Sequence, residues 1–244
     1  MIFNFNDERD RFFWGSFWHD DNCRNLSVLN PDDVILAVNK AYIDMTPRTI
    51  NGLGLSVDSV PKSYKKDYNG LVNKKIKLLN DLRQNLAKNI VNSVFKANQF
   101  KDAIHKSLCD TFKKEFEGLA DKLNKDIEQA NIPGLKRITT KKITYGKAQK
   151  IVNMTMKYLY FFDNANTYVN SVFNNCHMAI DEYIMVYFNK NGINRPGTSW
   201  SNFDDATYEE YQDGIKDYCN QKGEKPFFAE FKYWNQGRKI ANNP

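Results

Sequence analysis

The sequence predicts a mainly α-helical protein in which several helices form one globular body. Apolar residues recur at helical spacing through much of the chain, and no convincing alternation of apolar and polar residues indicates a β-sheet. The 244 residues are 41% hydrophobic and 14% aromatic, which is enough apolar material for a sizeable core.

Residues 1–60 are expected to form an aromatic-rich N-terminal segment that packs on the rest of the protein. Its clearest element is a helix that ends near residue 45, with Asn30 as N-cap and Pro31 at the first helical position. A loop follows at residues 46–61, and a minor strand within the first 60 residues is compatible with this composition.

Residues 61–130 predict a helical region, in which Gly70 and Gly118 are weak interruptions. The sequence "NIPGLKR", residues 131–137, then ends the helical pattern. The third region covers the rest of the chain, residues 131–244. Its predicted helices cover residues 147–162, a stretch from about residue 180, 204–220 and 226–240.

The composition excludes several classes of protein. No apolar run is long enough to span a membrane, and the N-terminus lacks the apolar stretch of a signal peptide, so a cytosolic protein is expected. The four cysteines and three histidines are scattered, which predicts free thiols and no metal site. No P-loop, dinucleotide, metalloprotease or hydrolase motif occurs, and no cofactor is expected.

Positive charge is concentrated in one part of the chain, whose net charge is +6. The stretch from residue 136 to residue 150 has no acidic residue, whereas residues 202–218 are strongly acidic. A local basic patch suits a polyanion, most simply a nucleic acid, although a solvated basic loop has the same composition. The basic residues of the patch are Lys136, Arg137, Lys141, Lys142, Lys147 and Lys150.

The predicted helix that follows this patch has an unusual combination of apolar residues and lysines. Lys150 and Lys157 are two turns apart and therefore share a face of a helix that is otherwise largely apolar. A solvent-exposed stripe of the helix would accommodate both lysines without a cost in stability. The alternative is a buried, chemically active lysine. Asp181 precedes another predicted helix, where an aspartate is usually a cap.

Together these stretches resemble the helix-hairpin-helix DNA glycosylase superfamily, and within it most closely the archaeal-type 8-oxoguanine glycosylases. The similarity covers about residues 120–240 and depends on "QKIVNMTMKY", "HMAIDEYIM" and the closing "PFFAEFKYWNQGR". It implies a helix-hairpin-helix-like DNA-binding element, with Lys150 at the position of the nucleophilic lysine and Asp181 at that of the catalytic aspartate. The sequence "TTKKITYGKAQ" offers one glycine, Gly146, where the family's hairpin is glycine-rich.

The resemblance also implies a mechanism. A base is flipped out of the duplex, the amine of Lys150 attacks the sugar C1′, and Asp181 stabilises the developing positive charge or relays a proton. The lysines of the hairpin and the Gly146 backbone would contact phosphates. Gln149 and Asn153 would read a base edge or join helices, and Lys157 is the second basic position of the helix. Trp234 would stack on the base or pack in the core, and His177 would face the pocket or pack.

Three functions remain in competition at this point. The first is a DNA glycosylase, with or without lyase activity, which acts on a damaged or modified base and works as a monomer. The second is a non-catalytic helical module that binds nucleic acid through residues 136–150. The third is a helical interaction protein with an acidic protein partner. Only the first requires Lys150 and Asp181 to converge on a pocket.

Overall fold

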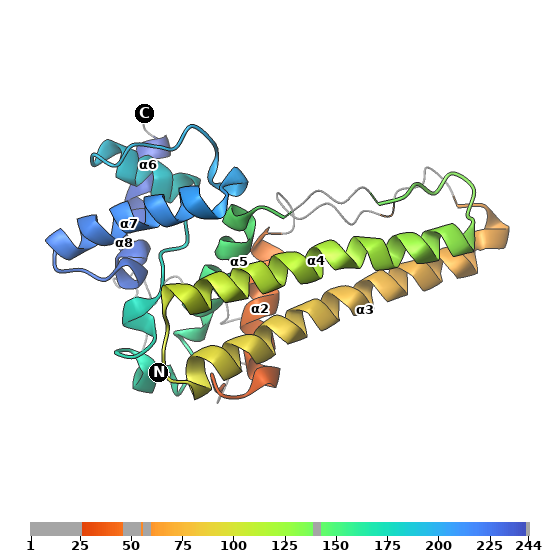
Figure 1. Ribbon diagram of the computed structural model, residues 1–244, viewed down its shortest axis with the longest axis horizontal. Helices are drawn as coiled ribbons and strands as arrows, with labels where there is room; N and C mark the ends of the chain where they lie inside the picture. The colour runs from red at the N-terminus through yellow and green to blue at the C-terminus, as the bar shows by residue number, and fades with distance from the viewer. Residues whose placement is uncertain (1–25, 46–54, 56–59, 139–142, 243–244) are drawn as a thin grey trace.

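The computed structural model describes residues 26–45, 55, 60–138 and 143–242 (Figure 1). Seven α-helices and no β-strand lie within these residues, which confirms the predicted mainly α-helical fold. The helices are α2 (Pro31–Met45), α3 (Lys65–Ile90), α4 (Asp102–Ala130), α5 (Tyr145–Leu159), α6 (Glu182–Lys190), α7 (Asp205–Gln221) and α8 (Pro226–Asn242). The aromatic residues before residue 26 lie outside the described part of the chain.

Helices α3 and α4 lie side by side and form a long arm that extends from the body of the protein (Figure 1). A π-helical turn, Val91–Lys96, continues α3, and the chain reverses before Asp102. Gly70 and Gly118 lie inside these helices, so the prediction that they interrupt the region was wrong. Nothing lies within 4 Å of a Cβ added at either glycine, because both lie where the helix surface is open.

The connection between α4 and α5 returns along the arm towards the body (Figure 1). Asn131 ends α4 in the left-handed conformation, which is a common helix stop. The Asn124 side chain of α4 then donates to the Ile138 carbonyl at 3.0 Å and accepts from its N–H at 2.7 Å. A long connection therefore precedes α5 where the resemblance implies a tight hairpin.

Helix α5 is the centre of the body and packs against α2, α4 and α7. Thr144 caps its N-terminus by accepting from the Lys147 N–H, and every residue of the helix except Lys147 is buried. The predicted Asn30 cap of α2 is present, since its side chain accepts from the Asp32 N–H at 3.1 Å. Segment 1–60 thus contributes a core helix to the body.

Two glycines allow very close contacts in the body. A Cβ at Gly146 in α5 would lie 1.9 Å from the Trp200 carbonyl oxygen, and a Cβ at Gly237 in α8 would lie 1.9 Å from that of Tyr183 in α6. Glycine is required at both positions because any larger residue would collide with backbone. These contacts fix the first turn of α5 and the crossing of α6 with α8.

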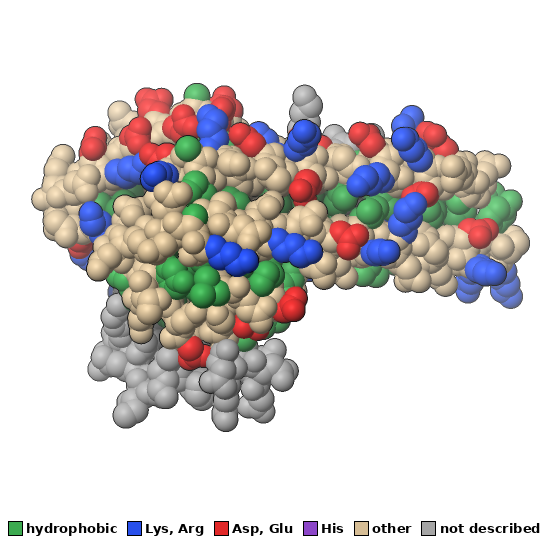
Figure 2. Space-filling model, turned by 60° about the horizontal axis from the view of Figure 1, so that its bottom comes forward, with side chains coloured by type: hydrophobic (Ala, Val, Ile, Leu, Met, Phe, Trp, Pro, Cys, Tyr) green, Lys and Arg blue, Asp and Glu red, His purple; other side chains and the backbone are tan. Residues whose placement is uncertain are grey.

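The surface of the arm carries charges of both signs. Figure 2 shows lysine, arginine and acidic side chains interspersed along it. None of the described helices is at once long enough and apolar enough to cross a lipid bilayer.

Candidate functional site

Lys150 and Asp181 meet at one point in the body, although they are far apart in the sequence. The Lys150 Nζ lies 2.8 Å from the Asp181 Oδ2, and the two side chains are 10% and 17% exposed. Lys150 also donates to the Ala179 carbonyl at 3.3 Å. We call this pair, with the Trp234 indole that contacts it, the Lys150–Asp181 site.

Asp181 has two roles at once. Its Oδ1 accepts from the Ile184 N–H at 3.0 Å and so caps α6, as its position in the sequence indicates. Its Oδ2 accepts from Lys150 and from the Trp234 Nε1–H, the latter at 2.9 Å. Burial alone would raise the pKa of this carboxyl, but the Lys150 charge and these hydrogen bonds outweigh it and hold the pKa below its usual value. Asp181 is therefore ionised at neutral pH.

Trp234 contacts both the Asp181 carboxylate and two neighbouring side chains. Its ring makes an edge contact with Tyr183 at 5.1 Å, and the Arg238 guanidinium lies 5.8 Å from its centroid. The residue is half-buried, so it is neither a pure core side chain nor a free surface one. Its indole N–H fixes the orientation of Asp181.

The other predicted residues of α5 hold the backbone segment that leads to Asp181. This segment, residues 176–181, is extended and has no neighbouring strand. Gln149 donates to the Ile180 carbonyl at 3.2 Å, and Asn153 donates to the Met178 carbonyl at 3.3 Å. Side chains of α5 thus satisfy buried carbonyls that a sheet would otherwise satisfy. Asn153 also reaches α7 by donating to the Tyr208 hydroxyl at 3.0 Å, whereas the Gln149 amide bonds its own helix and segment 176–181.

Lys157 forms a second ion pair deeper in the body. Its Nζ lies 2.7 Å from the Glu230 Oε1, with side chains 5% and 2% exposed, and 4.6 Å from the Phe231 ring centroid. The Glu230 Oε2 accepts from the Ala179 N–H at 2.8 Å. Glu230 therefore ties α5, α8 and segment 176–181 together. Lys150 and Lys157 share a face of α5 because each pairs with a carboxylate on that side, Asp181 or Glu230.

His177 is buried and lies between two polar partners. Its Nε2 is 2.7 Å from the Asp102 Oδ1, and its Nδ1 is 2.9 Å from the Tyr208 hydroxyl. Burial lowers the pKa of His177, and the hydrogen bond to Asp102 only partly opposes this. Among the described residues, no group of three or more potential ligands is placed to hold a metal ion.

The basic stretch is dispersed in the structure. Lys136 and Arg137 are exposed on the connection beside α4, where Arg137 pairs with Glu128 at 3.3 Å. The Gly146 N–H donates to the Phe203 carbonyl at 3.0 Å, so this amide is engaged within the protein. Lys147 is half-buried in the first turn of α5. Lys141 and Lys142 lie outside the described residues.

Several polar residues of the interior were not anticipated from the sequence. Glu230 is an isolated acid within the apolar stretch "PFFAEFKYW", and that isolation is the signal that marks it as buried and paired. Gln212 and His105 are also buried, but neither stands in a local pattern that distinguishes it.

Comparison of the chain with protein-family models, with curated proteins and with solved structures gives no significant match.

Proposed function

We propose that this protein is a DNA glycosylase with lyase activity, in which Lys150 is the nucleophile and Asp181 is its proton acceptor. The observation that carries the proposal is the Lys150–Asp181 contact of 2.8 Å at the head of α6, between a buried lysine and a half-buried aspartate whose side chains are 10% and 17% exposed. A purely structural ion pair needs no access to solvent, as the Lys157–Glu230 pair in the same helix shows. The sequence resemblance assigns the same two residues to this chemistry.

The proposed reaction uses the 2.8 Å contact between Lys150 and Asp181. The Lys150 ammonium passes a proton to the adjacent Asp181 carboxylate, and its freed lone pair forms a bond to C1′ of a flipped nucleotide. The bond between C1′ and the base breaks, and the base leaves with the electron pair and takes the proton from Asp181. Opening of the sugar gives a Schiff base on Lys150, from which strand cleavage proceeds. Trp234 keeps Asp181 oriented throughout.

Basic residues outside the site would bind the phosphates. Lys136 and Arg137 are exposed on the connection that precedes α5. Helix α3 adds to them, because its basic residues outnumber its two acids, Asp67 and Asp81. Its basic residues are Lys65, Lys66, Lys74, Lys75, Lys77, Arg83 and Lys88.

Borohydride trapping tests the nucleophile directly. The protein is incubated with duplexes that carry 8-oxoguanine, uracil, hydroxymethylcytosine or an abasic site, reduced, and examined for a covalent adduct. We expect an adduct with the wild type and with Lys190→Gln, which removes an exposed lysine from α6. We expect none with Lys150→Gln.

Asp181→Asn tests the second residue without loss of the helix cap, because asparagine caps as well as aspartate does. We expect base release to fall by about 10²- to 10⁴-fold, since the proton acceptor is lost. Circular dichroism checks that the variant remains folded. Base release without an adduct would move the mechanism to an activated water. Salt-dependent DNA binding with neither product would overturn the enzyme and leave the non-catalytic binding module.

A further inference from the structure

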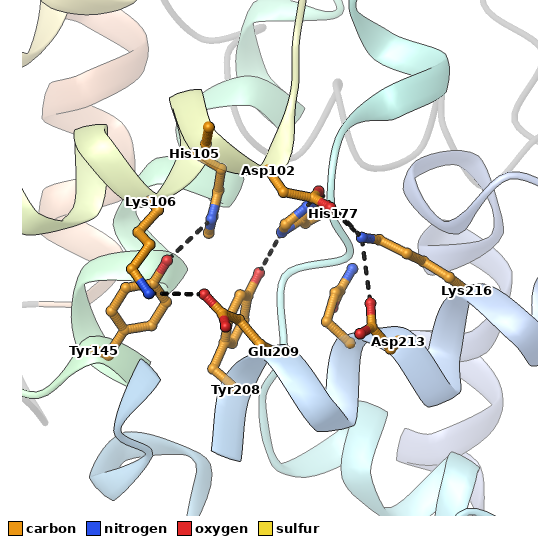
Figure 3. A pocket seen from close by; sticks show the side chains of 11 residues that line it. Asp102, His105, Lys106, Tyr145, His177, Tyr208, Glu209, Asp213 and Lys216 are labelled. Atoms are coloured by element: carbon orange, nitrogen blue, oxygen red, sulfur yellow. Dashed lines mark hydrogen bonds and ion pairs between the residues drawn. The ribbon is translucent and has the colours of Figure 1, made fainter. Parts of the chain in front are cut away.

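A pocket is lined by residues other than those of the Lys150–Asp181 site, and Figure 3 shows it from close by. It has a volume of about 230 Å³ and is enclosed by the first turn of α4, the start of α5, helix α7 and His177. Asp102, His105, Tyr145, Tyr208 and Gln212 are among the residues that line it, and neither Lys150 nor Asp181 is. The mechanism proposed above makes no use of it.

Gln212 is the residue that marks this pocket as a binding site. Its side chain is buried, with the residue only 1% exposed. Within the described residues, neither its Nε2 nor its Oε1 has a hydrogen-bond partner. A buried amide without partners is unfavourable for folding, and proteins keep such groups where they serve a ligand. The donor and the acceptor of Gln212 stand side by side and are both unsatisfied.

The other polar groups of the wall are already engaged with one another. Asp102 only accepts, so His177 donates to it through Nε2–H and accepts at Nδ1 from the Tyr208 hydroxyl. The Tyr208 oxygen in turn accepts from the Asn153 amide at 3.0 Å. This chain of hydrogen bonds fixes the wall and leaves Gln212 as the group that can recognise a ligand.

The interior of the pocket is aromatic and uncharged. The His105 ring is stacked on Tyr208 at 5.4 Å with an angle of 15° between planes, and it lies 4.2 Å from the His177 ring. Burial is the main cause that lowers the pKa of His105 and of His177 below the usual value for histidine. Both rings are therefore neutral at pH 7. Flat aromatic walls favour a flat ligand.

The mouth of the pocket does not attract anions. Its two lysines are already paired, Lys106 with Glu209 and Lys216 with Asp102 and Asp213 (Figure 3). Lys106 also pairs with Asp205 at 3.1 Å. Carboxylates therefore outnumber the ammonium groups around the opening. A phosphate or a DNA strand would be repelled here, whereas an uncharged molecule would not.

We propose that this pocket binds a free nucleobase or nucleoside, held by Gln212 through an edge that presents an acceptor beside a donor. The pairing is the one by which glutamine recognises an adenine edge in DNA. The pocket is smaller than the 300–1,000 Å³ typical of drug-sized ligands, which limits the occupant to a small ring system. This site is distinct from the proposed catalytic site and does not depend on its activity.

Binding is measured by isothermal titration calorimetry with the full chain and no DNA. The ligands are the common nucleobases, their nucleosides and their nucleoside monophosphates. The wild type is expected to bind at least one base or its nucleoside, and the monophosphate more weakly. Gln212→Leu removes the amide at similar volume, and binding is expected to weaken at least tenfold. Gln221→Leu changes an exposed glutamine of the same helix and is expected to bind as the wild type does.

The stability of the free variants provides a second readout. Because the Gln212 amide has no hydrogen-bond partner in the described part of the chain, Gln212→Leu is expected to unfold at the same temperature as the wild type or higher, and Gln212→Met serves if the leucine variant does not fold. Absence of binding by every base and nucleoside up to millimolar concentration would overturn the proposal. Equal binding by the Gln212 variant, or tighter binding of the monophosphate, would overturn it as well. Borohydride trapping reports on Lys150 alone, so failure at one site is distinguishable from failure at the other.

Discussion

Single residues in this protein often serve two purposes, and Asp181 shows why a local pattern is insufficient to assign a role. One carboxylate oxygen caps α6 and the other receives Lys150 and Trp234. The sequence offered a cap and a catalytic aspartate as alternatives, whereas the geometry accommodates both. Function at such a residue has to be tested with a substitution that keeps the cap.

The Lys157–Glu230 pair is predicted to matter more for stability than any surface pair. Glu230→Gln keeps an acceptor for the Ala179 N–H but removes the carboxylate charge that lies 2.7 Å from the buried Lys157 Nζ. We expect a loss of about 3–5 kcal/mol in the free energy of unfolding, measured by urea denaturation. The control is Glu182→Gln, which breaks the exposed pair with Arg195 and should cost under about 1 kcal/mol. Equal losses of unfolding free energy in the two variants would contradict the prediction that the buried pair contributes more to stability than the exposed one.

The two adjacent histidines, His105 and His177, predict a pH dependence of stability. The folded-state pKa of His105 and of His177 is depressed by burial, so the unfolded chain binds more protons below its own pKa of about 6.5. Their contribution to stability is therefore complete above about pH 6.5 and is lost as the pH falls towards the folded-state values. Each histidine contributes up to about 1.4 kcal/mol per pH unit in that range.

Thermal unfolding between pH 8 and pH 5 measures this effect. The titratable groups around the two rings are Asp102, Cys109, Tyr145, Tyr208, Asp213 and Lys216. The hydrogen bond from His177 is the main cause that lowers the pKa of Asp102. That carboxyl titrates below about pH 3.8, outside the range of the experiment. His105→Gln should flatten the slope. A melting temperature that is constant from pH 7 to pH 5 would show that the histidines are not neutral in the folded state.

At the scale of elements, two glycines set how closely helices approach other backbone. Gly146→Ala and Gly237→Ala place a methyl group 1.9 Å from a carbonyl oxygen and are expected to destabilise the protein by about 3 kcal/mol or more. Gly70→Ala and Gly118→Ala are matched controls, since both lie in helices with nothing within 4 Å of the added Cβ. These controls should stabilise by about 0.5–1 kcal/mol, and urea denaturation of all four variants gives the comparison.

Helix α5 explains how an element can be buried all round and still carry polar residues. Three of its polar side chains, Gln149, Lys150 and Asn153, each donate to a backbone carbonyl of segment 176–181. The helix thus replaces the missing neighbour strand of that segment. An apolar helix with periodic lysines and amides is the signature of this arrangement.

At the scale of the whole molecule, DNA binding is predicted to fall steeply with salt. Replacement of Lys136 and Arg137 with glutamine should reduce the slope of log affinity against log salt by roughly 2, at about 0.9 per phosphate contact. The charge-matched control replaces Lys190 and Lys222, which are exposed on helices α6 and at the end of α7. Fluorescence anisotropy with a labelled duplex measures both slopes. Identical slopes for the two variants would show that Lys136 and Arg137 do not contact DNA phosphates.

The sequence alone determined the helical class and most helix positions, because caps, prolines and apolar periodicity act over a few residues. The helix that begins at Pro31 and the closing helices near residues 204–220 and 226–240 agree closely with α2, α7 and α8. It also singled out Lys150 and Asp181 as the residues to examine. These properties depend on residues that are close in the sequence, so they can be predicted from one sequence.

Only the tertiary structure decided which partners those residues have. Gln149 and Asn153 were expected either to read a base edge or to join helices, and in the structure both donate to backbone carbonyls of segment 176–181, while Lys157 pairs with Glu230. The pocket around the unsatisfied Gln212 amide is lined by residues of α4, α5 and α7. No short stretch of sequence specifies how these three helices come together. Hydrogen bonds and ion pairs between distant segments depend on how helices cross, and that crossing is set by packing of the whole core.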